Sequence, residues 1–471
     1  MGSYCRTLRY IPQRIMFYLS CKEKKASGEF IAGCFLFRKF SANIRCLTAF
    51  FLFIVPYNLS AQDTTKTLPN GTDGLTFTPR ESDSTFIKVH NDLPPNEFTG
   101  IYGTFKIGLG YIGDFTAYAQ DKVFKQQMDS LGLDLTPHYQ TRDFRFMFSG
   151  RLLKTKRFIG YRFAYMYDGD KKIWMMRETG LTIGVPELKG TFFIGRTKEG
   201  YSMIKVMNGH SGPANERQMS LDPIPILADG IKYFGYFPKP RVFMNLGAYN
   251  DFLSKGQSFS TLAWQYVARV GWVPINDPKN KKVLHIAGNF SYGKPLNDTF
   301  LIKSRPESNP TPQLINTGKF PASRSTSIGA EVYYGNGSFM IGSEVMQHKF
   351  YSDKTEDHTF PGGDVWISYL FTGSHRPYNT SNGNIFGFVP VKKSVFKGGW
   401  GEIEGVLHIS TFDLNDKDIR GGQFTRITPM VNWYLSQALR WELIYGYGIL
   451  DRLGLKGHVH FFETRIQLTL L

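Results

Sequence analysis

The sequence predicts an all-β fold in which sixteen antiparallel strands close into a transmembrane β-barrel. Apolar and polar residues alternate with a period of two in many short stretches, which places them on opposite faces of a strand. Turn-forming residues separate these stretches, and their apolar faces are rich in Phe, Tyr and Trp, which make up 15% of the 471 residues. After the first 61 residues no stretch shows a convincing helical period or 18 consecutive apolar residues, so membrane-spanning helices are not expected.

The first 61 residues are expected to be a secretory signal peptide. Arg38, Lys39 and Arg45 precede the apolar run at 46–55, and the small residue Ala61 follows a short polar stretch. A charged region, about ten apolar residues and a small residue before the cleavage site form the pattern of an export signal. The run is shorter than the roughly 20 residues that a membrane-spanning helix needs. We therefore expect export of the chain and cleavage near Ala61.

This leader changes the meaning of the overall composition. The whole chain has 56 basic and 39 acidic residues, a formal charge of +17 that would ordinarily raise nucleic acid as a partner. Nine basic and two acidic residues lie in the leader, so the mature chain carries +10. All four cysteines also lie there, so the exported chain is expected to use neither disulfides nor thiol-ligated metals. We expect no nucleic-acid partner and no cofactor.

Two regions follow the leader. Residues 62–98 are polar, with clusters of Thr, Asp, Ser, Asn and Pro, which predicts an extended N-terminal periplasmic segment without a core of its own. Residues 99–471 carry the alternating pattern and are assigned to the barrel domain. They supply about 23 residues for each strand with its connection, enough for tilted strands of about ten residues.

The sixteen strands are expected to begin at regular intervals along this domain. The first is typical, because Phe105, Ile107 and Leu109 share one face while Thr104 and Lys106 share the other. The approximate starts, in chain order, are Ile101, Asp143, Phe158, Ile173, Thr191, Ile231, Val242, Leu262, Val283, Thr326, Phe339, Val365, Ile403, Thr425, Leu439 and His458.

The connections are expected to alternate between short turns and long loops, as in an up-and-down barrel of the outer membrane. Short turns are predicted at 154–156, 238–240, 335–337 and 436–438. Long loops are predicted at 113–139, 198–230, 294–323 and 411–422. One connection, 372–399, should be a short turn by this alternation but is long. Either it holds an extra folded segment, or the strand count is off by one hairpin.

A soluble β-sandwich is the alternative interpretation of alternating strands, with the apolar face as its core. Sixteen strands exceed one sandwich, and aromatic-rich faces fit the girdles of a membrane barrel. A closed barrel also leaves no strand edge, so every backbone polar group is satisfied in lipid. The pattern therefore favours the membrane barrel.

Residues opposite the aromatic faces should line the interior of the barrel. The basic residues predicted there, as candidate pore-lining and anion-binding residues, are Lys106, Arg145, Arg151, Arg162, Arg241, Arg269, Arg426, Arg440 and Arg465. The acidic residues with the same parity are Asp143, Glu331, Glu344, Glu404 and Glu442. A cationic excess in a narrow lumen attracts anions, and the arginine fork matches phosphate oxygens. The alternative is that many of these arginines pair with the acids.

Four segments near the C-terminus resemble the phosphate-selective porin O and P family of Gram-negative outer membranes. They are residues 364–378, 398–416, 431–435 and 462–468, among which Asn432-Trp-Tyr-Leu435 is similar to the family's own Asn-Trp-Tyr-Leu. The sequence departs from the family pattern at a few positions, which are Phe371, Ser374, His375, Ile403, His408 and the final Leu470-Leu471.

The resemblance implies a 16-stranded trimeric channel with an anion-selective pore, whose third external loop, here residues 198–230, folds inward as a constriction. The expected function is an outer-membrane porin through which anions, phosphate or polyphosphate, diffuse passively; an enzyme is not expected. The expected surroundings are outer-membrane lipid and lipopolysaccharide, around a homotrimer. A general non-selective porin, a structural or adhesive barrel and a lipase-type barrel are the alternatives.

Overall fold

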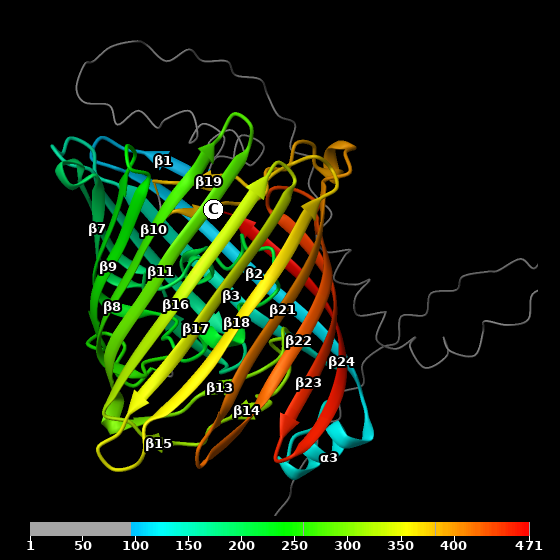
Figure 1. Cartoon of the computed structure of the whole chain (residues 1–471). Coiled ribbons are helices and arrows are strands. Elements are labelled where there is room, and N and C mark those ends of the chain that lie inside the picture. The colour runs from blue at the N-terminus through cyan, green and yellow to red at the C-terminus, as the bar shows by residue number, and fades with distance from the viewer. Residues whose placement is uncertain (1–95, 258, 382, 471) are drawn as a thin grey trace, which may run out of the picture. The chain divides into compact units, whose positions relative to one another are not determined.

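The computed structural model describes residues 96–257, 259–381 and 383–470, so the predicted leader 1–61 and almost all of the predicted segment 62–98 lie outside the described residues. The described chain forms an antiparallel β-barrel (Figure 1). The barrel closes because the last strand pairs with the first long one, with Leu470 opposite Leu109. The wall therefore has no free strand edge, and the predicted fold class is confirmed.

Sixteen strands form the wall, each antiparallel to its neighbours. The pieces β5 and β6 count as one, because both pair with β4. The wall strands are β2 (Thr104–Gln120), β3 (His138–Arg151), β4 (Ile159–Asp168), β5 (Ile173–Met176) with β6 (Thr179–Val185), β7 (Gly190–Thr197), β8 (Ala228–Phe237), β9 (Val242–Asn250), β10 (Leu262–Asp277), β11 (Lys282–Pro295), β16 (Arg324–Asn336), β17 (Phe339–Tyr351), β18 (His358–Leu370), β21 (Glu402–Asp416), β22 (Ile419–Tyr434), β23 (Leu439–Arg452) and β24 (Leu455–Leu470).

Shorter elements lie before and between the wall strands. Strand β1 (Glu97–Thr99) pairs with the start of β2. Two-stranded pairs lie within the connections: β12 (Thr299–Phe300) with β15 (Phe320–Pro321), β13 (Lys303–Ser304) with β14 (Ile315–Asn316), and β19 (Tyr378–Asn379) with β20 (Ile385–Phe386). The α-helices are α3 (Lys122–Ser130) and α4 (Met203–Val206). Neither of these helices, in the part of the chain that the structure describes, is long and apolar enough to cross a membrane.

Two of the predicted long loops are wrong in detail. Strands β21 and β22 continue through the mostly polar residues 413–418 to a tight turn, where Lys417 takes a φ of 55°, so 411–422 is mostly strand. Strand β2 likewise runs on to Gln120, and α3 follows it. The Asp121 carboxylate caps this helix by accepting a hydrogen bond from the Phe124 amide at 2.6 Å. Such a cap stabilises a short helix, and this helix buries Phe124 and Met128 on one face.

The two rims of the barrel differ in their connections (Figure 1). We call the rim where β2 begins and β24 ends the terminal rim, and the opposite one the loop rim. The four predicted short turns all lie at the terminal rim, as expected. The long connection 371–401 also lies there and holds the extra folded segment, β19 and β20. The longest connections of the loop rim are 121–137, 198–227 and 296–323.

The two faces of the wall follow the predicted alternation. On the outer face Phe146, Tyr165 and Trp174 are exposed, and the Trp174 ring stacks on the other two with ring centroids 6.1 and 5.4 Å away. Exposed aromatic groups of this kind are typical of the interfacial girdles of a membrane barrel. The inner face carries buried polar and charged residues, among them Asp114 and Arg465.

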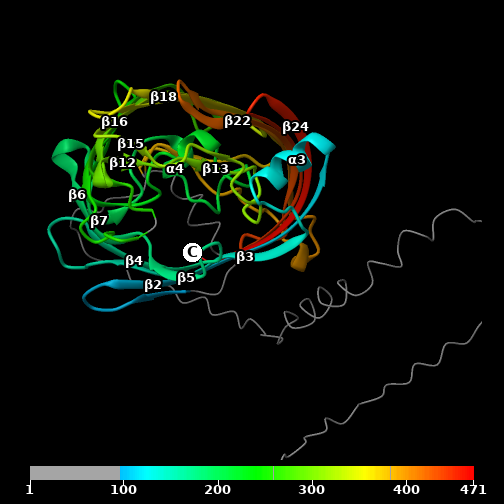
Figure 2. The same cartoon turned by 90° about the horizontal axis from the view of Figure 1, so that it is seen from below.

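The lumen is filled by chain segments that fold in from both rims. Figure 2 shows α4 and β13 inside the ring of wall strands. Two apolar clusters cover their contacts with the wall. One gathers Phe300, Phe320 and Phe350 near the loop rim, and the other gathers Phe243, Trp366 and residues of β20. The barrel is therefore packed over part of its cross-section, and passage is limited to the space that remains.

Candidate functional site

The connection between β7 and β8, residues 198–227, enters the lumen, and we call it the constriction loop. The Met203 amide donates to Glu331 of β16 at 2.8 Å. The Ile204 amide donates to Glu344 of β17 at 3.0 Å. Carboxylates at a helix start satisfy amides that have no partner inside the helix. The acidic pair, directly opposite in the sheet, thus holds the beginning of the constriction loop.

Arginines of the opposite wall hold the second half of this loop. Three guanidinium groups each donate to one of its carbonyls: Arg440 to Gly212 at 2.8 Å, Arg465 to Asn215 at 2.7 Å and Arg426 to Arg217 at 2.5 Å. Hydrogen bonds from charged donors contribute about 1.5–3 kcal/mol each. These arginines, predicted as anion-binding candidates, therefore fix the path of the loop backbone.

The same three arginines also have carboxylate partners in the lumen. Arg465 pairs with Asp114 at 2.6 Å, Arg440 with Glu442 at 2.7 Å and Arg426 with Glu307 at 3.8 Å. All of these side chains are buried. A buried charge needs such partners because its desolvation costs several kcal/mol. Their positive charge is thus largely balanced by buried carboxylates of the wall and, for Arg426, of the connection 296–323.

Residues 371–401, which we call the terminal-rim segment, enter from the opposite end. The Arg376 guanidinium donates to both carboxylate oxygens of Glu404 on β21, at 3.1 and 2.8 Å. The Arg269 guanidinium of β10 donates to the carbonyl of Gly383 at 2.8 Å. Arg269 also pairs with Glu331 at 2.6 Å and is fully buried. This predicted candidate thus anchors a second inserted segment.

Residues 296–323 cover part of the lumen at the loop rim, and we call them the lid loop. The Glu307 carboxylate lies 2.7 Å from Nδ1 of His408, whose Nε2 lies 3.0 Å from Asp364. The charge of His408 and that of Arg426 hold the pKa of Glu307 below its usual value, although burial alone would raise it. The lid loop is therefore tied to β18 and β21 by a buried charged triad.

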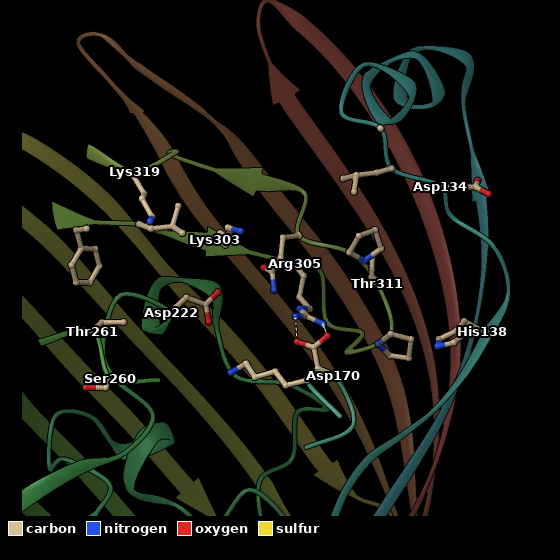
Figure 3. A pocket seen from close by; sticks show the side chains of 18 of the residues that line it. Asp134, His138, Asp170, Asp222, Ser260, Thr261, Lys303, Arg305, Thr311 and Lys319 are labelled. Atoms are coloured by element: carbon tan, nitrogen blue, oxygen red, sulfur yellow. Dashed lines mark hydrogen bonds and ion pairs between the residues drawn. The ribbon is translucent and has the colours of Figure 1, made fainter. Parts of the chain in front are cut away.

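Beside the inserted segments, in the part of the chain that the structure describes, lie two adjoining cavities. The larger, of about 1100 Å³, opens between the lid loop, the β4–β5 turn and the start of β3, and we call it the vestibule (Figure 3). The smaller, of about 390 Å³, lies between the constriction loop and β3 to β5, and we call it the chamber. Asp170, Lys171, Asp222 and Arg305 line both, so they mark the neck that joins the two spaces.

An ion pair spans this neck. Arg305 of the lid loop lies 2.9 Å from Asp170 of the β4–β5 turn, and Asp222 lies nearby in Figure 3. Burial raises the pKa of Asp222 to about 6, so this carboxyl gains a proton more readily than an ordinary one. Four basic and three acidic residues line the vestibule, so its own charge bias is small.

The chamber is strongly basic by comparison. Ten Lys and Arg residues line it against five Asp and Glu residues. Arg142 pairs with Glu216 at 2.7 Å and Arg145 with Asp143 at 2.5 Å, yet the Arg142 and Arg145 side chains remain 24% and 12% exposed. They therefore present donors to the space while their carboxylates hold them in place.

Arg177 and Arg217 complete the basic lining of the chamber. Among the described residues, neither guanidinium forms a hydrogen bond or an ion pair. Burial lowers the pKa of Arg217 to about 10, and the charge of Arg142 acts in the same direction. The two groups are thus cations in a confined space whose nearest carboxylates, among the described residues, lie beyond ion-pair distance. This is the chemistry of an anion-contacting site.

Four of the other predicted candidates lie away from the chamber. Lys106 is half-buried on β2, Arg151 is exposed at the end of β3, and Arg162 pairs with Glu178 at 3.2 Å. Arg241 does not lie in a strand: it occupies the β8–β9 turn with a φ of 56° and donates to the Pro274 carbonyl at 2.5 Å. Of the nine candidates, Arg145, Arg426 and Arg465 line the chamber.

Sequence parity missed three chamber arginines for local reasons. The β2–β3 register shifts at Arg142, because Ile112 pairs with Asp143 and Gly113 with Thr141. A bulge of this kind re-aims a side chain, so Arg142 joins Arg145 on the inner side. Arg177 lies in the break between β5 and β6, and Arg217 lies on the inserted loop. Arg142 and Arg145 are three positions apart, so a regular strand would place them on opposite faces of the sheet. An arginine on the face expected to meet lipid is the signal that could have indicated a bulge.

Two glycines allow the constriction loop to approach the wall. A Cβ at Gly110 of β2 would lie 2.9 Å from Cε1 of His210, and one at Gly200 would lie 2.1 Å from the Asn245 side chain. Both positions therefore favour glycine, because any larger residue would push the loop away from the wall.

Comparison with known proteins agrees with this architecture. The family described as phosphate-selective porin O and P matches residues 105–469, which is nearly the whole barrel. A protein of Caulobacter vibrioides, described only as uncharacterized, is 27% identical over 142 residues. That match covers 30% of this chain and 28% of the Caulobacter protein.

Several solved structures share the fold at low sequence identity. An anion-selective porin from Comamonas acidovorans is 12% identical, with a TM-score of 0.50 over 78% of this chain and 100% of the porin. The outer membrane channel DcaP of Acinetobacter baumannii is 8% identical, with a TM-score of 0.51 over 80% of this chain and 100% of the channel. OmpF of Salmonella typhi is 10% identical, with a TM-score of 0.50 over 79% and 100%. At these identities the likeness concerns the barrel fold alone.

Proposed function

Because the chain belongs to the phosphate-selective porin O and P family of outer-membrane porins, we propose that it forms a passive diffusion pathway selective for anions, with phosphate or polyphosphate among them. Membership of this family makes the chain a porin and not an enzyme. The proposal concerns its selectivity, the residues responsible and its assembly.

One observation supports anion selectivity above the others. Arg177 and Arg217 line the chamber beside Arg142 and Arg145, and within the described part of the chain neither forms an ion pair with a carboxylate. Ten basic and five acidic residues line the chamber. Arg426 and Arg465 among them are balanced by Glu307 and Asp114, which lie behind the lining. The field of the positive excess that remains attracts anions and repels cations. In a narrow space with low-dielectric walls such a field raises the local concentration of anions. We infer that the chamber is the selectivity filter.

The buried arginines take a supporting part in this proposal. Arg426, Arg440 and Arg465 donate to carbonyls of the constriction loop and so hold one side of the chamber in place. Arg269 holds the terminal-rim segment instead. Permeating anions meet chiefly the more exposed groups of β3 and the constriction loop. In this arrangement the loop rim, with the vestibule, faces the outside of the cell, and the terminal rim faces the periplasm.

The proposal extends to export and assembly. A signal peptide cleaved near Ala61 delivers the chain to the periplasm, and the aromatic outer face meets membrane lipid and lipopolysaccharide. The exposed ring cluster of Phe146, Tyr165 and Trp174 offers a surface where copies of the chain pack as a homotrimer.

Reversal potentials test the proposal. Purified full-length protein is placed in a planar bilayer under a potassium chloride gradient. The reversal potential should have the sign expected when chloride is more permeant than potassium. A general porin would give a potential near zero, and a structural, adhesive or lipase-type barrel would carry no reproducible current. Either result would overturn the proposed selectivity.

A further inference from the structure

The chamber has an apolar part that inorganic anions do not need. Met166 and Met175 line it, together with Ile226 of the constriction loop. The two methionines are buried against Leu227 and Phe259, whereas Ile226 is 38% exposed. Ile226 therefore offers apolar surface to the chamber, and an apolar group that covers this surface removes it from water.

The strand register places this apolar part next to the arginines. Arg145 of β3 lies opposite Met166 of β4, and Met166 lies opposite Met175 of β5. Directly opposed side chains in an antiparallel sheet have Cβ atoms about 5 Å apart. Arg177 follows Met175 by two residues and lines the same chamber. The guanidinium of Arg145 and the thioethers of Met166 and Met175 therefore form a row across β3, β4 and β5. The guanidinium of Arg177 lies next to the end of this row.

We propose that the chamber binds organic anions with an aromatic body, such as aromatic carboxylates, in preference to inorganic anions of the same charge. The carboxylate lies at Arg145, Arg177 and Arg217. The ring lies on the exposed Ile226 and reaches the edges that the buried Met166 and Met175 present to the chamber. Methionine sulfur makes favourable contacts with aromatic rings, and its flexible side chain adapts to different ring shapes. A chamber of about 390 Å³ holds a single ring with its carboxylate. The inference rests on the proposed anion selectivity and specifies its substrate class.

Inorganic phosphate fits this surface less well. It keeps its hydration shell on all sides, and a thioether wall offers no hydrogen bond to replace lost water. An aromatic carboxylate turns its charged end to the arginines and removes apolar surface from water at the other end. Aromatic carboxylates and inorganic phosphate both offer a negative charge to the arginines. The apolar part of the chamber therefore distinguishes them, because only the aromatic carboxylate has an apolar ring that can cover it.

The test compares benzoate with acetate as blockers of the chloride current through single channels of the full-length protein. Both anions carry one carboxylate, so their ratio isolates the effect of the ring. In the wild-type protein the half-blocking concentration of benzoate should be about tenfold lower than that of acetate, the factor expected from partial burial of a ring. At about pH 5, where phosphate is the monoanion, phosphate should block less well than benzoate, and an equal block would overturn the preference.

Variants of the apolar part then locate the effect. Met175→Gln and Ile226→Ser should each reduce the benzoate preference by about threefold or more, since each removes apolar surface from the contact. Met175→Leu keeps an apolar side chain of similar volume and serves as the matched control, with the benzoate preference retained. Ile226→Ser keeps the test informative if the polar substitution at Met175 prevents folding.

The outcomes separate this inference from the proposed function. An anion-selective channel that benzoate and acetate block equally, or one whose benzoate preference survives both Met175→Gln and Ile226→Ser, overturns the aromatic-anion site alone. A wild-type channel that prefers cations overturns the proposed function itself, and the inference with it.

Discussion

The substitution Arg217→Gln tests the role of the chamber most specifically. Glutamine keeps a long polar side chain, and the backbone carbonyl that receives the Arg426 hydrogen bond remains in place. The change removes one positive charge from a space of about 390 Å³, in which an anion at the centre lies about 4.5 Å from the lining. At that separation a unit charge contributes about 1 kcal/mol even at the dielectric constant of water.

This energy gives the expected size of the effect. A loss of about 1 kcal/mol lowers the occupancy of the chamber by an anion about fivefold. Repulsion of cations weakens at the same time, so the anion-to-cation permeability ratio should fall by at least about fivefold. The effect should be greatest near 0.1 M salt, where the screening length of about 10 Å exceeds the chamber radius, and should shrink near 1 M.

The assay is the reversal potential of Arg217→Gln and Arg177→Gln in planar bilayers. Arg157→Gln is the matched control, because Arg157 pairs with Glu187 at 2.8 Å near the terminal rim and is about half exposed. Unchanged circular dichroism and gel mobility would establish that the barrels have folded. If both chamber variants fold and retain the wild-type permeability ratio, the chamber is not the selectivity filter.

Three further predictions concern the segments inside the barrel. Arg465→Ala leaves Asp114 and the Asn215 carbonyl without their partner. In guanidinium titrations it should lower the free energy of unfolding by about 3–5 kcal/mol. The control Arg162→Ala, at an exposed ion pair, should lower it by less than about 1 kcal/mol. Replacement of residues 379–385 by a short Gly-Ser link should raise single-channel conductance, since Gly383 and Asn384 occupy lumen beside Arg269; unchanged conductance would mean that these residues lie outside the path. Burial lowers the pKa of His210 to about 4, so between about pH 6.5 and 4 the unfolded chain binds a proton that the folded chain does not. The free energy of unfolding should therefore fall by about 1.4 kcal/mol per pH unit as the pH decreases through this range. The variant His210→Gln should flatten that slope.

The wall of the barrel could be predicted from sequence because its signal is local. Alternation along each strand identifies the faces from neighbouring residues alone, so the number of strands and the inward position of Arg269, Arg426 and Arg440 followed from parity. Errors arose where local chemistry imitates a different structure. The run at 413–418 has the composition of a loop, yet cross-strand pairing keeps it extended.

The partners of the lumenal charges could not be predicted in the same way. Arg440 donates to Gly212, and Arg465 donates to Asn215 on the same inserted loop. These contacts join residues more than two hundred positions apart and depend on how the loop folds inside the barrel. Parity indicates that an arginine points inward, but it does not distinguish a guanidinium that holds a backbone carbonyl from one that meets a passing anion. The positions of Arg177 and Arg217 depend likewise on a strand break and on the inserted loop.

The most direct measurement of the central claim is the reversal potential of the wild-type protein in a planar bilayer under a potassium chloride gradient near 0.1 M. The excess of unpaired arginine in the chamber predicts a potential of the sign set by chloride, and a decline of selectivity as both salt concentrations rise. A potential of the sign set by potassium would contradict the account, because the charged lining would then not govern passage through the barrel.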